Sequence, residues 1–173
     1  MAAIIASLVG LLALIVAGYT AYIQRQQVRA QVWPYLQMGV ANADGQHGFV
    51  ISNPGVGPVI VRSVQVLAAG KPVNDWTGLF RAMDFKGATS GSNFLNQNVL
   101  AAGARFDWIA FPDAATFDKF QDDWARFHVV ARICYSSTLG EDWMVLYGAD
   151  VSALRPRAIS HCPNVPYSQQ FHR

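Results

Sequence analysis

An uninterrupted apolar run at residues 2–23 constrains the fold of this chain more than any other feature. The run, AAIIASLVGLLALIVAGYTAYI, carries no charge, and the first charged side chain belongs to Arg25. A helix needs about 20 apolar residues to cross the hydrocarbon core of a bilayer, so the run is long enough. Tyr19 and Tyr22 lie at its far end, where an aromatic belt is expected at the membrane interface. The sequence therefore predicts a transmembrane anchor over residues 1–24.

A cleaved signal peptide is the competing interpretation of this run. It would carry positive charge before the apolar residues and a small-residue cleavage site after them, and neither is clear in the sequence. An uncleaved anchor is therefore favoured, followed by a polar helical stalk over 25–33 that Pro34 ends. Arg25 and Arg29 follow the anchor, and positive charge tends to stay on the cytoplasmic side. The sequence thus leans towards a cytoplasmic domain, with a periplasmic domain as the alternative.

Small residues recur along the anchor at intervals of three or four. They are Ala6, Gly10, Ala13, Ala17 and Ala21. This spacing lets two helices approach closely inside a membrane, although alanine is also simply common in such helices. Besides lipid, the expected partners are a membrane protein or a second copy of the chain.

The composition of the chain excludes several classes of protein. Hydrophobic residues make up 52% and charged residues 14%, which is too apolar for a disordered chain. The net charge is +2 and the basic residues form no stripe, so nucleic-acid binding is not expected.

Residues 34–152 read as a β domain. Short β-branched or aromatic runs alternate with glycine, proline and asparagine, as in HGFVISN, VIVRSVQV and WMVLYGADV. About seven such strands, with one or two inserted helices, predict an antiparallel β-sandwich of immunoglobulin type. The remainder, 153–173, is rich in proline and polar residues and is expected to be an irregular tail.

One stretch of this domain, NPGVGPVIVRSVQV at residues 53–66, raises the question of a phosphate-binding loop. Gly55 and Gly57 have a G-x-G spacing. A dinucleotide-binding loop requires a third glycine and a following helix, whereas here a β-branched strand follows. We therefore expect a tight corner of the β domain, with no cofactor.

The segment PDAATFDKFQDDWARF at 112–127 predicts an amphipathic helix. Phe117, Phe120, Trp124 and Phe127 form an aromatic stripe with helical spacing. Packing on the sheet is the favoured role for this stripe, and docking of a partner is the alternative.

The residue types that carry chemistry are few and do not form a familiar motif. Cys134, Cys162, His128 and His161 lack the short paired spacings of structural zinc sites, so metal is disfavoured. A Cys134–Cys162 disulfide and a pair of small buried thiols remain open as alternatives. There is no nucleophile-elbow or zinc-protease motif, and we expect no enzyme.

Two arginines lie within apolar strand segments. Arg62 and Arg132 each lie in the middle of a mostly apolar strand segment. An exposed sheet face explains both, while contact with an anion or a partner is the alternative.

Three segments, RAQVWPYLQMGV, FVISNPGVGPVIVRSVQVLAAGKPV and RICYSSTLGEDWMV, resemble a group of uncharacterised bacterial single-pass membrane proteins. Its members share an anchor, a stalk, a Trp-Pro-Tyr segment at the first strand and an Asn-x-Gly-x-Gly-Pro turn before an immunoglobulin-like β domain. The resemblance implies a bacterial inner membrane location. Ser136 and Asp142 stand where further cysteines are expected in the group, so no metal or redox role carries over.

These observations predict a membrane-anchored interaction module, a scaffold or accessory subunit of a membrane protein assembly without catalysis. The alternative is a ligand-binding or sensory domain tethered to the membrane.

Overall fold

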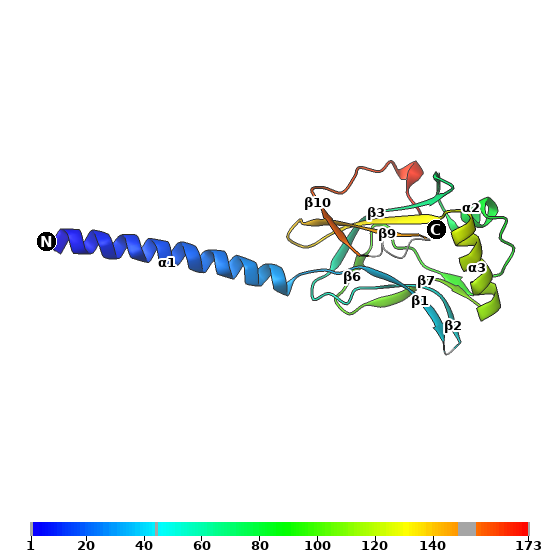
Figure 1. The fold of residues 1–173 in the computed structure, drawn as a ribbon, viewed down its shortest axis with the longest axis horizontal. Helices are drawn as coiled ribbons and strands as arrows, with labels where there is room; N and C mark the ends of the chain where they lie inside the picture. The colour runs from blue at the N-terminus through cyan, green and yellow to red at the C-terminus, as the bar shows by residue number, and fades with distance from the viewer. Residues whose placement is uncertain (1, 44, 149–154, 173) are drawn as a thin grey trace.

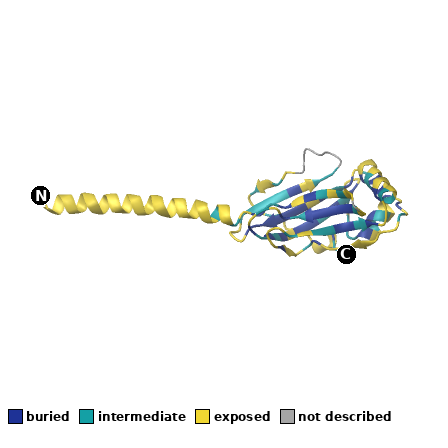
Figure 2. Ribbon diagram, turned by 90° about the horizontal axis from the view of Figure 1, so that it is seen from below, coloured by how far each residue is buried: buried dark blue, intermediate teal, exposed yellow. Residues whose placement is uncertain are grey.

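The computed structural model describes residues 2–43, 45–148 and 155–172. Helix α1 (Ala2–Gln31) is 30 residues long and projects from a β domain (Figure 1). None of its residues is buried, and its apolar part is long enough to span a membrane (Figure 2). The helix ends before Pro34, which cannot donate the next helical hydrogen bond.

The β domain is built from two antiparallel sheets. The first has the strand order β1-β2-β7-β5. Its strands are β1 (Gln37–Ala43), β2 (Gln46–Ser52), β7 (Arg105–Phe111) and β5 (Gly91–Ser92). The second has the order β10-β9-β8-β3-β4, with β6 also paired to β3. Its strands are β10 (Arg157–Ile159), β9 (Asp142–Tyr147), β8 (Val130–Ser136), β3 (Val59–Ala68), β4 (Lys71–Val73) and β6 (Val99–Leu100).

One hydrophobic core joins the two sheets. The first sheet contributes Phe49, Ile51 and Trp108, and the second contributes Val64 and Ile133, among others. Each of these side chains is fully buried or within 1% of it. In β3, Val59 and Val61 enter this core before an irregularity in the pairing with β8, and Val64 and Val66 enter it afterwards, so the inward-facing positions shift by one residue there. Within each half, alternate side chains are buried, which specifies the register on β8.

Helix α3 (Ala114–Arg126) lies against the sheets as its aromatic stripe predicts (Figure 1). Phe117, Phe120 and Trp124 are buried, with ring centroids 5.0–5.7 Å from that of Phe49. The Asp113 carboxylate accepts a hydrogen bond from the Thr116 backbone N–H at 2.7 Å and caps the helix. That hydrogen bond lowers the pKa of Asp113. The predicted packing of the stripe is confirmed.

Two further pieces of helix complete the domain. Helix α2 (Trp76–Ala82) follows β4 and is capped by the Asp75 side chain. The 3-10 helix η2 (Tyr167–Gln169) lies near the C-terminus.

The C-terminal segment is more ordered than its composition predicts. It supplies β10, which pairs with β9, and the buried side chains Val165 and Phe171. The Phe171 ring lies 4.9 Å from that of Trp76 and 5.8 Å from that of Trp108. The described part of this segment is therefore a structural part of the domain, where an irregular tail was expected.

Candidate functional site

The corner at residues 53–58 binds the segment that follows α1 through backbone hydrogen bonds. The carbonyl oxygen of Trp33 accepts hydrogen bonds from the N–H groups of Val56 at 3.0 Å and Gly57 at 3.1 Å. A Cβ atom on Gly57 would lie 2.0 Å from the Val32 carbonyl oxygen, and one on Gly55 would lie 2.5 Å from the Tyr35 nitrogen. Only glycine permits this approach of two backbones. The glycine corner therefore holds the junction with α1.

Asn53 fixes this corner from within. Its side chain is fully buried, and its Oδ1 accepts hydrogen bonds from the N–H groups of Tyr35 and Gly55. Its Nδ2 donates to the carbonyl oxygens of Gly57, Leu100 and Ala101 at 2.9–3.1 Å. One amide thus satisfies backbone groups from three segments, as buried polar groups require.

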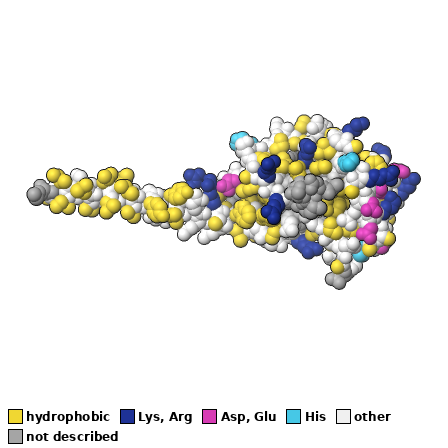
Figure 3. Space-filling view, viewed as in Figure 1, with side chains coloured by type: hydrophobic (Ala, Val, Ile, Leu, Met, Phe, Trp, Pro, Cys, Tyr) yellow, Lys and Arg dark blue, Asp and Glu magenta, His cyan; other side chains and the backbone are white. Residues whose placement is uncertain are grey.

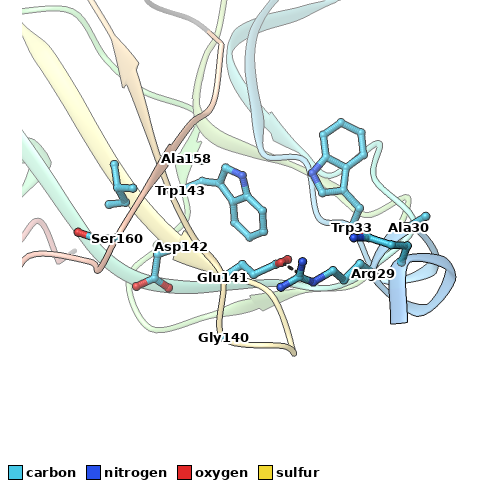
Figure 4. Close-up of a pocket in the computed structure, with 11 residues that line it drawn as sticks. Arg29, Ala30, Trp33, Gly140, Glu141, Asp142, Trp143, Ala158 and Ser160 are labelled. Atoms are coloured by element: carbon cyan, nitrogen blue, oxygen red, sulfur yellow. Dashed lines mark ion pairs between the residues drawn. The ribbon is translucent and has the colours of Figure 1, made fainter. Parts of the chain in front are cut away.

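A cleft of about 750 Å³ opens beside this junction (Figure 4). One wall comes from the end of α1 and the residues that follow it, and the other comes from the β8–β9 turn, β9 and β10. The side chains that line it are those of Gln26, Arg29, Ala30, Trp33, Glu141, Asp142, Trp143, Ala158, Ile159 and Ser160, together with Gly140. Because α1 leads into this cleft, the cleft lies next to the membrane when α1 spans it.

An ion pair joins the two walls of the cleft. Arg29 Nε lies 3.1 Å from Glu141 Oε1, and the two side chains are 42% and 34% exposed. Figure 4 shows this pair with the indoles of Trp33 and Trp143 beside it. Trp143 stacks on Tyr135 with a centroid distance of 5.6 Å, while Trp33 remains 48% exposed. The cleft therefore offers both signs of charge next to aromatic surface.

Asp142 belongs to a separate network under the cleft. Its Oδ1 accepts a hydrogen bond from Ser136 Oγ, and its Oδ2 accepts one from the Cys162 N–H at 2.7 Å. Ser136 Oγ in turn accepts from Arg62 Nε at 2.9 Å. This network holds the C-terminal segment against the β8–β9 hairpin.

A disulfide bond between Cys134 and Cys162 reinforces that attachment. It bridges residues 28 positions apart, with the Cα atoms 5.8 Å from one another. Both thiols are consumed, so the four-ligand metal set considered from the sequence is not formed. The described residues contain no cluster of three or more His, Cys, Asp or Glu side chains able to hold a metal.

The two strand arginines are not brought together. Arg62 lies at an irregularity in the β3–β8 register and contacts Ser136. Arg132 lies four residues before Ser136 on β8, about 13 Å along the strand, and is exposed. They form no common anion site with each other.

Residues that matter in the cleft were not identified from the sequence as a site. Arg29 and Trp33 precede the first strand, whereas Glu141 and Trp143 belong to the last hairpin. No local spacing connects the two groups, and only the fold brings them together. The Asn-x-Gly-x-Gly-Pro corner was recognisable from the sequence, but its hydrogen bonds and close backbone contacts with residues 32–35 were not.

Comparison of the chain with protein-family models, curated proteins and solved structures gives no match.

Proposed function

We propose that the protein is a membrane-anchored interaction module, a scaffold or accessory subunit of a membrane protein assembly. The observation that carries this proposal is the rigid junction at residues 32–35 and 53–57. The segment directly after an exposed apolar helix is held by backbone hydrogen bonds to a domain with its own core. Such a junction presents the domain in a defined orientation above the bilayer, which suits contact with neighbouring membrane proteins.

The order of the strands supports an immunoglobulin-type sandwich for this domain. In immunoglobulin domains, strands A, B, E and D form one sheet and strands C, F and G the other. In their order across the sheet, β1, β2, β7 and β5 occupy the places of A, B, E and D. Likewise β3, β8 and β9 occupy those of C, F and G, and β4 extends the sheet beside β3. Helix α3 is then an insertion between strands E and F.

Two surfaces remain for partners in this proposal. Within the described residues, β1 pairs only with β2, so its outer edge is open to another strand. On α1, the small residues lie on the face opposite the cleft. Ala17 is nine residues, about two and a half helical turns, from Gln26 and therefore lies on the other side of the helix. The set Ala6, Gly10, Ala13, Ala17 and Ala21 therefore offers a packing face to a second helix while the cleft stays open.

The disulfide supports placing the domain on the oxidising side of a bacterial inner membrane. Disulfides persist in the periplasm and are rare in the cytosol. Arg25 and Arg29 alone favour the opposite side, but Arg29 is paired with Glu141. Fusion of a fluorescent protein or a periplasm-active phosphatase to the C-terminal end decides between the two. Phosphatase activity alone is the expected result, and fluorescence alone contradicts the periplasmic assignment.

No catalysis is assigned to the chain in this proposal. The cysteines are bonded to one another, and the two histidines considered from the sequence lie far apart. His128 precedes β8, whereas His161 follows β10, which pairs through β9 with the other end of β8.

Purification of the full chain in mild detergent tests the proposal. We expect a membrane protein partner or a second copy to co-purify, and Ala13→Leu with Ala17→Leu to weaken that association. Ile15→Leu, which keeps the volume of a side chain on the other face, is the matched control. If the chain purifies as a lone monomer under conditions that preserve other membrane complexes, the proposal of an interaction module is wrong.

The cleft favours a second function, a ligand-binding domain tethered to the membrane. Its volume falls in the range of small-molecule sites, and its walls combine indoles with charged groups.

A further inference from the structure

We propose that the cleft between α1 and the β9–β10 edge binds the headgroup of a zwitterionic phospholipid that carries a phosphate and an ammonium group. The inference rests on the membrane anchor of the proposed function and names a ligand for its tethered domain. The height of the cleft relative to the bilayer, the face of α1 that leads into it and the charges of its walls support this proposal.

The cleft begins at the height of the lipid headgroups. The apolar run of α1 ends at Ile23, and a helix rises about 1.5 Å per residue. Gln26 therefore lies about 4.5 Å beyond the hydrocarbon core, and Arg29 about 9 Å beyond it. The headgroup layer of each leaflet is about 5–7 Å thick. The mouth of the cleft lies within that layer, and its inner end lies just outside.

A single face of α1 leads from the membrane into the cleft. Gln26 and Ala30 both line it and are four residues apart, hence on the same side of the helix. Steps of four and three back along the helix reach Tyr22, Tyr19, Ile15 and Leu12. An acyl chain can lie on the large apolar side chains of this face. Tyr22 then lies at the boundary of the hydrocarbon core, where such residues are enriched, and Tyr19 lies about one helical turn deeper.

The charges in the cleft complement a zwitterion. Arg29 and Glu141 are both partly exposed, and their pair is the salt bridge that spans the walls. A phosphate can accept hydrogen bonds from Arg29, with Arg25 one turn nearer the membrane. An ammonium group can donate to Glu141 and lie against the indole of Trp33 or Trp143. The zwitterionic headgroup thus places its negative phosphate against Arg29 and its positive ammonium group against Glu141.

A purely anionic lipid fits this arrangement less well. Its phosphate would find Arg29, but it would bring negative charge close to Glu141 without any compensating cation. Figure 3 shows acidic and basic side chains together where the helix meets the domain, and no uniformly basic surface there. The junction therefore discriminates between headgroups and does not merely attract negative charge.

Lipid retention measured by native mass spectrometry tests the proposal. The full chain in mild detergent is titrated with phosphatidylethanolamine or phosphatidylglycerol. We expect one phosphatidylethanolamine to be retained with about tenfold preference, the scale of a charge-assisted hydrogen bond. Glu141→Gln should shift the preference towards phosphatidylglycerol, and Arg29→Gln should weaken both. Arg126→Gln, on α3 and away from the cleft, is the control and should change neither.

A photo-crosslinking residue at Ala158 identifies the occupant in intact membranes. A lipid-sized adduct that Trp143→Ala removes supports the proposal. A protein-sized adduct, a lack of headgroup preference, or variants that behave as the control would overturn it. Equal competition by soluble glycerophosphoethanolamine would show that the ligand is a free headgroup and would also overturn it. Membrane flotation separates this failure from that of the anchor, because a chain that does not float refutes the proposed function itself.

Discussion

The backbone N–H of Gly57 donates a hydrogen bond to the carbonyl oxygen of Trp33 at a distance of 3.1 Å. This contact ties the corner before β3 to the chain that leaves α1. It converts what could be a flexible stalk into a fixed joint, because neighbouring contacts from Val56 and Asn53 restrain the same residues. The orientation of the domain relative to α1 thus depends on a few glycine contacts.

Gly57→Ala should loosen this joint. The new Cβ atom would lie 2.0 Å from the Val32 carbonyl oxygen, so the two backbones must separate. Overpacking of this kind costs about 1–3 kcal/mol. Spin labels at Gln24 and Asp118 should report a broader distance distribution in the variant. Gly39→Ala is the control, since a Cβ atom there meets nothing within 4 Å. An unchanged distribution in Gly57→Ala would show that the joint is held elsewhere.

Asn53→Asp should destabilise the domain although the side chain keeps its shape. The carboxylate cannot donate to the carbonyl oxygens of Gly57, Leu100 and Ala101, and it is buried among them. The expected loss is about 2–4 kcal/mol in the free energy of unfolding, measured by urea denaturation in detergent. Acidification should recover part of it, because a protonated carboxyl group can donate once. Asn93→Ala, at an exposed position with one side-chain hydrogen bond, should cost under about 1 kcal/mol.

Loss of the disulfide should lower stability by about 3–4 kcal/mol, the value expected for closing a loop of this length. The bond links positions 28 apart and holds the C-terminal segment on β8. Urea unfolding of Cys134→Ser with Cys162→Ser, compared with the oxidised wild type, measures the difference. Reduced wild type is the control and should match the variant. Identical midpoints with and without reductant would mean that the two thiols are not bonded in the purified protein.

Stability should fall as pH rises from about 10 to about 12. Burial raises the pKa of both Tyr135 and Tyr147 to about 12, whereas unfolded tyrosine ionises near 10. In that window the unfolded chain loses protons that the folded chain keeps, so deprotonation favours unfolding. Thermal unfolding followed against pH measures the decline. Tyr147→Phe removes one of the two groups and should make the decline shallower; an equal slope would contradict the shifted pKa of Tyr147.

Local patterns predict the parts of this fold that depend on neighbours in sequence. The apolar run of α1, the β-branched run of β3 and the aromatic stripe of α3 each carry a local signal, and each forms the expected helix or strand. The residues of β3 that face the core were not predictable in this way, because the inward-facing positions shift at Arg62. The role of Phe171 could not be predicted in this way, because one ring among prolines and polar residues has no period. Its burial against Trp76 arises from the tertiary fold alone.

The cleft was unpredictable for the same reason. Arg29 belongs to the stalk and Glu141 to the last hairpin, and a surface ion pair between distant segments leaves no spacing in the sequence. Its formation follows from the antiparallel order of β8 and β9, which places the hairpin turn at the end of the domain from which α1 projects.

The burial of Phe171 also orders events during synthesis. Helix α1 precedes the domain in the chain and is long and apolar enough to enter a bilayer while most of the domain is still untranslated. The core around Trp76 and Trp108 is complete only once residue 171 has emerged, because the Phe171 ring packs on both indoles and its N–H bonds to the Val64 carbonyl oxygen. When α1 spans the bilayer, the nascent domain therefore completes its folding next to the membrane, where chaperones and partners can reach it before its core is complete.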